Sequence, residues 1–237
     1  MERENDIMSK DELKIVSVVN FVRGGKSSIS RLLAEKLNTT IMNFDPKRDS
    51  EFYNAVKTKN IPENSTIKRI ENGLEIENED EIITIKSNSN YFICDFGGRF
   101  DERINEFESD CYVIPMMDDY ESISESIRAT KYILEANPKA KIIHVLNMVM
   151  CQGKDEKEDF RKGYKQNLEE NQLDKIPALE MPRSKLLKRI INDGVTENEI
   201  INDTNTLIGK KSFRVIHEFT DKLINEIKKE IGASREK

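Results

Sequence analysis

Apolar and polar positions change period along the chain, from continuous apolar runs to helical spacing and back. Residues 15–19 form a short run rich in β-branched side chains, which suits a strand buried on both faces. Apolar residues then recur at helical spacing from Ile29 to Leu37. An apolar run followed by a segment with helical spacing recurs toward the C-terminus. It predicts an α/β fold, a mainly parallel sheet with helices on both faces.

The same periodicity predicts the remaining elements. Residues 60–90 stand apart, because short alternating runs are separated by polar residues and Asn72-Gly73 is a hairpin signal. They predict a small antiparallel insertion at the sheet edge. Further strands are expected at 40–44, 91–95, 111–115, 141–147 and 176–179, and helices at 49–57, 119–136, 153–172, 183–192 and 206–231.

Length and charge fit one domain. The 237 residues suffice for one large α/β domain, expected at 13–232 between flexible tails at 1–12 and 233–237. No run approaches the roughly 20 apolar residues of a membrane span, and the charged N-terminus lacks the apolar core of a secretory signal. The net charge of −6 excludes a generally basic nucleic-acid binder, so any DNA contact needs a local basic patch.

The cysteines and histidines do not indicate a metal site. Cys94, Cys111 and Cys151 are far apart and form no C-x-x-C pair, so we expect reduced thiols in a cytoplasmic protein. The two histidines, His144 and His217, are isolated, and packing is the expected role for each.

The segment between the first strand and the first helix carries a phosphate-binding pattern. A short loop ends in two glycines, and Lys-Ser-Ser follows at the helix start. Main-chain N–H groups and the helix dipole favour an anion there. Lys26 would reach the β- and γ-phosphates, and Ser27 would hold Mg²⁺. The alternative is a solvated turn. The residues expected around the phosphates are Gly24, Gly25, Lys26, Ser27 and Ser28.

The loop departs from the standard G-x-x-x-x-G-K-[ST] pattern, because Asn20 occupies the place of the first glycine. Asparagine tolerates left-handed backbone angles better than most residues. We therefore expect the turn to survive this replacement.

Two predicted strands end in acidic residues. Asp45 follows the strand at 40–44, and Asp95 ends the strand at 91–95. The carboxyl ends of parallel strands form the ligand-binding rim of α/β proteins. Asp95 fits the carboxylate that holds Mg²⁺ in phosphate-loop NTPases. Gly97 and Gly98 would let the backbone approach a γ-phosphate, although an ordinary turn explains them as well.

Taken in order, these segments resemble the ParA/MinD family of deviant Walker-A P-loop ATPases, especially short plasmid-partition ParA proteins. The resemblance implies ATP and Mg²⁺ as ligands. It also implies that Asp45 lies near the attacking water and the metal, that Asn147 reads the adenine, and that the backbone near Pro182 encloses the base. The matching segments are VVNFVRGGKSS, NFDPKRDS, YFICDFGG, VLNMV and MPRSKLLKRIINDG.

The family's signature lysine, which contacts the partner's phosphates across an ATP-bridged dimer, is replaced by Phe21. Arg23 lies in the same loop and could supply the charge, since a guanidinium binds phosphate bidentately, or it could point to solvent. The candidate catalytic residues are therefore Lys26 and Asp45, with Arg23 as the possible substitute for the missing lysine, and the candidate metal ligands are Ser27, Asp45 and Asp95. Arg23, Gly97, Asn147 and Pro182 join the nucleotide-binding set.

The resemblance implies a homodimer closed by ATP, a ParB-like adaptor and non-specific DNA binding for plasmid or DNA segregation. A degenerate ATP-binding switch with little hydrolysis, acting through a protein partner, remains the alternative, and the missing lysine favours it. A membrane cycler would need a detachable amphipathic tail, which the last helix does not resemble. Candidate DNA-binding residues, which could equally be a solvated helix face, are Arg183, Lys185, Lys188, Arg189, Lys210, Lys211 and Arg214.

Overall fold

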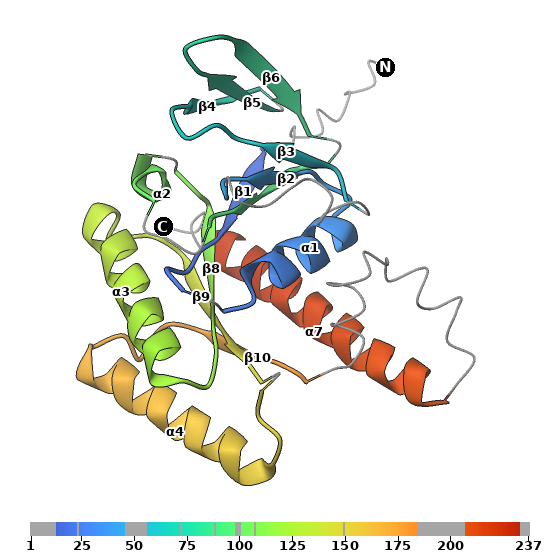
Figure 1. Cartoon of the computed structure of the whole chain (residues 1–237), viewed down its shortest axis with the longest axis vertical. Helices are drawn as coiled ribbons and strands as arrows, with labels where there is room; N and C mark the ends of the chain where they lie inside the picture. Colours follow the sequence, from blue (N-terminus) through green and yellow to red (C-terminus); the bar gives the residue numbers. More distant parts are fainter. Residues whose placement is uncertain are drawn as a thin grey trace, which may run out of the picture.

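The computed structural model describes most of the chain as an α/β fold (Figure 1). The described residues are 13–22, 24–45, 56–71, 73–87, 89–97, 101–106, 108–148, 150–183 and 207–232. The helices are α1 (Lys26–Lys36), α2 (Arg103–Glu106), α3 (Tyr120–Ala136), α4 (Lys154–Glu170) and α7 (Leu207–Gly232). The strands are β1 (Lys14–Val18), β2 (Ile41–Asn43), β3 (Thr58–Asn60), β4 (Thr66–Ile70), β5 (Gly73–Glu77), β6 (Ile82–Lys86), β7 (Tyr91–Asp95), β8 (Cys111–Met116), β9 (Ile142–Asn147) and β10 (Ala178–Met181).

The main sheet has seven strands in the order β10-β9-β8-β1-β7-β2-β3. Its neighbouring strands all pair in parallel. The central strand β1 aligns Val18 with Asp95 on one side and with Val113 on the other. The carboxyl ends of β1, β2 and β7 therefore meet at one edge, where Asn43 also pairs with Asp95.

Helices cover both faces of this sheet, which confirms the predicted architecture (Figure 1). α1 and α7 pack on one face, where their apolar side chains share a core cluster with Val16 and Val18 of β1. α3 and α4 pack against each other on the opposite face. Strands buried on both faces explain the continuous apolar runs in the sequence.

The antiparallel insertion expected at 60–90 is confirmed as the sheet β4-β5-β6. Its alternation places Leu74 and Ile76 in the same core cluster as residues of α3, with Ile67 and Ile85 packed against that cluster. Lys68 and Thr84 face the other side, as expected for a sheet covered on one face. In Figure 1 this small sheet lies beyond the β2-β3 edge of the main sheet.

The histidine of β9 packs in the core, where it is fully buried. His144 Nε2 lies 2.8 Å from Thr130 Oγ1 of α3, and Nδ1 lies 3.0 Å from the Tyr164 hydroxyl of α4. Burial lowers the pKa of His144 to about 3, so the ring is neutral at physiological pH. Both helices that cover this face are thus tied to the sheet through one imidazole.

Several boundaries differ from the prediction. β10 begins two residues later than expected, and neither β3 nor α2 was predicted, because each is short and polar. The helices expected at 49–57 and 183–192 fall mainly outside the described residues, and the described residues 56–57 and 183 are not helical; both tails lie wholly outside. Within the described part of the chain, no helix is long and apolar enough to cross a bilayer. The three cysteines are free and buried.

Candidate functional site

The start of α1 has the geometry of an anion site. Gly25 occupies the N-cap position in the left-handed region, with φ 90° and ψ 22°, and offers no side chain to cap the helix. No acidic residue lies in the first turn. The first N–H groups of a helix lack intrahelical acceptors and lie at the positive end of the dipole. An uncapped N-terminus beside Lys26 therefore favours a negatively charged ligand.

Both glycines of the loop are required by close contacts. A Cβ on Gly24 would lie 2.2 Å from the Pro115 carbonyl oxygen of β8. A Cβ on Gly25 would lie 2.6 Å from Nδ2 of Asn147, the last residue of β9. The Asn147 amide also donates to the Gly24 carbonyl at 3.2 Å. The loop is therefore pressed against the carboxyl ends of β8 and β9. The Pro115 carbonyl leaves no room for a Cβ at Gly24, and the positive φ of Gly25 strains any other residue there.

Asn20 anchors the loop through its side chain. Its Nδ2 donates to the Pro115 carbonyl at 2.6 Å and to Ser126 Oγ of α3 at 3.0 Å, and its Oδ1 accepts from Val22 N at 3.3 Å. Asn20 is completely buried. Its backbone does not use the left-handed angles that asparagine tolerates, because Asn20 is not among the described non-glycine residues with positive φ. Three hydrogen bonds of a buried amide thus hold the loop at the position where the standard pattern has glycine.

Lys26 is folded into the loop. Its side chain is buried, and Nζ donates to the Val22 carbonyl at 2.7 Å. The ammonium group is thus held beside the loop backbone that would surround a phosphate. Ser27 and Ser28 follow on the first turn of α1, and both are buried.

The two acidic strand ends meet at the same edge. Asp95 ends β7 with a buried side chain, and its carbonyl accepts from Phe44 N at 2.9 Å. The residue after Phe44, Asp45, is partly exposed. A Cβ on Gly97 would lie 3.3 Å from Asp45 Cγ, so the loops after β2 and β7 touch. Asp45 and Asp95 therefore lie on one rim, as their place in the sequence predicts.

These carboxylates fit a magnesium site in kind. Mg²⁺ is commonly held by one or two carboxylates together with water and substrate phosphates, and a hydroxyl completes the set in phosphate-loop proteins. Ser27, Asp45 and Asp95 supply those groups at the carboxyl ends of β1, β2 and β7. In the described residues, no group of three or more His, Cys, Asp or Glu side chains gathers to form an all-protein site.

The thiol beside Asp95 is not available for chemistry. Cys94 is fully buried, and this desolvation raises the pKa of its thiol far above the usual range, with the nearby Asp95 charge acting in the same direction. A neutral buried thiol is a poor nucleophile.

Phe21, which the sequence resemblance aligns with the signature lysine, belongs to the core. It is 7% exposed, meets Tyr132 of α3 edge to face at 6.2 Å between ring centroids, and lies under the Arg128 guanidinium at 5.7 Å. The side chain therefore points toward α3. Arg23, proposed as its replacement, lies outside the described residues, as does Gly98.

The residues expected at the base and at DNA are placed only in part. Pro182 follows β10, whose Met181 pairs with Asn147, so it lies next to the end of β9. Arg183 is exposed, and Arg214 of α7 pairs with Glu218 at 2.7 Å. Lys210 and Lys211 belong to α7. The other three candidates, Lys185, Lys188 and Arg189, fall outside the described residues.

Comparison with known proteins identifies solved structures that share this fold. No protein-family model and no curated protein matches the sequence. Among solved structures, the chain is similar to a Borrelia burgdorferi protein described as a plasmid partition protein bound to AMPPNP, with 14% identity, 90% of this chain and 99% of that chain covered and a TM-score of 0.55. It is also similar to apo McdA of Cyanothece, with 12% identity, 87% and 99% coverage and a TM-score of 0.55.

A third structure gives the same result. The ATP complex of a Cyanothece McdA variant has 11% identity, covers 93% of this chain and 97% of that chain, and has a TM-score of 0.56. The chain has a ParA/MinD-like fold. At such low identity this likeness establishes the fold alone, so the chemistry of this ParA/MinD-like chain is argued from its own residues.

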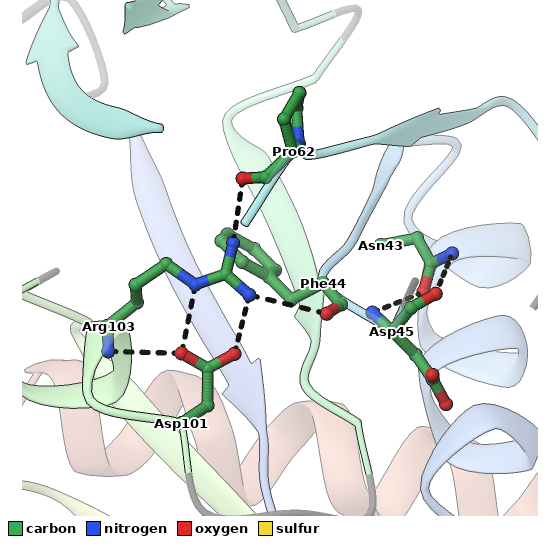
Figure 2. A network of polar contacts seen from close by, with 6 residues as sticks. All are labelled: Asn43, Phe44, Asp45, Pro62, Asp101 and Arg103. Carbon is green, nitrogen blue, oxygen red and sulfur yellow. Dashed lines mark hydrogen bonds and ion pairs between the residues drawn. The ribbon is translucent and has the colours of Figure 1, made fainter. Parts of the chain in front are cut away.

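Two features at the carboxyl edge of the main sheet were not predicted from the sequence. One is the anchoring of the loop by Asn20, described above. The other is Arg103 at the start of α2, which contacts Phe44, the residue directly before Asp45 (Figure 2). The Asp101-x-Arg103 spacing was its only signal, and such pairs are common on protein surfaces.

Proposed function

We propose that this chain is a ParA-like ATPase that dimerises with ATP and serves in plasmid or DNA segregation. The observation that carries the proposal is the glycine-bent, uncapped start of α1, which is pressed against β8 and β9 with Lys26 buried beside it. In this proposal Lys26 binds the β- and γ-phosphates, and Gly24 to Ser28 surround them with main-chain N–H groups.

The acidic rim completes the proposed site. Ser27, Asp45 and Asp95 would hold Mg²⁺, which when bound neutralises charge on the phosphates. Asp45 would orient the attacking water, and the backbone of Gly97 would contact the γ-phosphate. Asn147 and Pro182 are proposed to border the adenine. Asn147 Nδ2 already donates to Gly24, which ties the proposed base site to the phosphate loop.

Dimerisation is proposed to bring a second copy onto this edge. Phe21 carries no charge, and its ring packs against α3, so it does not contact a partner's phosphate in this proposal. Arg23 is the loop residue proposed for that role. We therefore expect hydrolysis to be weak, with stimulation by partners.

DNA and an adaptor are the proposed partners. Contacts of ATP-bound dimers with DNA would be phosphate-directed and would weaken with salt. The proposed DNA-binding residues are Arg183, Lys185, Lys188, Arg189, Lys210, Lys211 and Arg214. A ParB-like adaptor would supply the link to the cargo.

A sedimentation experiment tests this proposal. We expect wild type with ATP and Mg²⁺ to shift from monomer to dimer, and Lys26→Ala to remain monomeric. The Arg23→Ala variant separates the arginine's role: retained dimerisation in that variant contradicts a trans contact by Arg23. Failure of wild type to dimerise with any adenine nucleotide contradicts the partition model.

A degenerate nucleotide switch is the second candidate, and the core position of Phe21 favours it. Such a protein would bind ATP, hydrolyse little or none and act through a protein partner, for example in conjugation or plasmid regulation. ATP turnover separates the two candidates. Stimulation by DNA and a partner supports segregation, whereas tight binding without turnover supports the switch.

A further inference from the structure

Arg103 joins three separate segments of the chain (Figure 2). Its Nε and Nη2 donate to the two carboxylate oxygens of Asp101 at 2.9 and 2.7 Å. Nη1 donates to the Pro62 carbonyl at 2.9 Å, and Nη2 also donates to the Phe44 carbonyl at 3.4 Å. Asp101 therefore orients the guanidinium, whose remaining donors hold the chain after β2 and after β3.

The same guanidinium ends a stack of rings. It lies 5.0 Å from the centroid of Phe44, and Phe44 stacks on Phe96 at 4.3 Å with an interplanar angle of 15°. Both rings are 1% exposed. Phe44 directly precedes Asp45, and Phe96 directly precedes Gly97. The stack therefore links the loop that bears Asp45 to the loop that bears Gly97.

Backbone contacts run between the same two loops. Phe44 N donates to the Asp95 carbonyl at 2.9 Å, and Gly97 lies against Asp45. Displacement of either loop would therefore break the ring stack or strain it against the Arg103 hydrogen bonds. Interiors packed in this way transmit displacement, because side chains interdigitate without voids.

The chemistry of this contact requires arginine. The Arg103 and Asp101 side chains are only 12% and 16% exposed, so a broken pair would leave a largely desolvated charge. A guanidinium offers a planar fork for Asp101 and a flat face for Phe44, whereas a lysine ammonium offers a single point charge.

We propose that Arg103 is a positioning residue that couples the loop bearing Asp45 to the loop bearing Gly97, so that both respond together to a γ-phosphate. This inference rests on the proposed nucleotide site. Arg103 itself contacts no phosphate in the proposal. It acts through Phe44 and Phe96. Loss of Arg103 would therefore weaken the binding of ATP, which needs both loops at its γ-phosphate, more than the binding of ADP.

Arg103→Lys tests the coupling, and Arg69→Lys is its matched control. Arg69 also donates to two carbonyls and one carboxylate, those of Leu13, Glu108 and Asp110, but at the amino end of the main sheet. In the nucleotide-free protein we expect hydrogen exchange at residues 41–45 and 92–97 to be about tenfold faster in Arg103→Lys, since a charged hydrogen-bond network is lost. Arg69→Lys should leave both segments at the wild-type rate.

Nucleotide affinity gives the second readout. Arg103→Lys should weaken binding of a non-hydrolysable ATP analogue about tenfold and that of ADP by less than about twofold, because none of its described hydrogen bonds reaches the phosphate loop. Equal losses for both nucleotides, as a merely structural role would give, overturn the proposal. Faster exchange in one segment alone also overturns it.

A second variant guards against misfolding. Phe96→Leu keeps apolar volume but removes the ring stack, and it should accelerate exchange in both segments while circular dichroism stays native. Unchanged exchange in both Arg103→Lys and Phe96→Leu refutes the coupling. If wild type binds neither nucleotide, the proposed function fails, while the exchange comparison still decides whether the two loops are coupled.

Discussion

Asn20→Ala tests the most unexpected feature of the phosphate loop. The substitution removes a fully buried amide with three contacts, to Pro115, Ser126 and Val22. Each hydrogen bond contributes on the order of 1 kcal/mol net, and buried partners left unpaired add to the loss. We expect the free energy of unfolding to fall by about 2–4 kcal/mol.

The loop should also lose its fixed shape. Because the variant must order the loop on binding, we expect affinity for ATP with Mg²⁺ to fall about tenfold. Urea unfolding measures the first effect and titration calorimetry the second. Asn167→Ala is the control, since Asn167 donates to Gly163 within α4, at 2.8 Å, and should cost less than about 1 kcal/mol. Equal stability of the Asn20 variant and wild type would refute the anchoring role.

Other single positions give three more tests. Gly25→Ala should lower the free energy of unfolding by about 1–3 kcal/mol and abolish nucleotide binding, because φ is 90° and the new Cβ would lie against the Asn147 amide. Gly163→Ala is the control and should not destabilise the protein, because a Cβ there meets no atom within 4 Å. Phe21→Lys should destabilise by about 2–4 kcal/mol, and Phe21→Leu by less, since the lysine would be buried near Arg128; unfolding in urea checks both. Burial lowers the pKa of His144 to about 3 from 6.5, so below pH 6.5 only the unfolded chain takes up the proton. The stability difference between wild type and His144→Gln should therefore shift by about 2 kcal/mol against wild type from pH 7.5 to 5.0; a constant difference contradicts the buried neutral ring.

The sequence was sufficient for the frame of the fold because its strands are buried on both faces. Such strands appear as continuous apolar runs, and the amphipathic helices between them reveal a parallel sheet. β7 was predicted with its bounds as observed, and the site rim followed from Asp45 and Asp95 at strand ends.

The missing parts depend on contacts between distant residues. β3 is three polar residues and exists because β2 offers it a parallel partner. The role of Asn20 depends on Pro115 and Ser126, about a hundred residues away in the chain. Arg103 likewise contacts Phe44 and Pro62, and no local pattern predicts such a meeting.

Titration calorimetry of wild type and Lys26→Ala with ATP and Mg²⁺ tests the central claim most directly. The buried ammonium group beside the uncapped start of α1 predicts saturable binding of one ATP per chain to wild type. Lys26→Ala should bind at least about tenfold more weakly, because a charge-assisted contact is lost. Equal binding by both proteins, or no binding by folded wild type, would contradict the account.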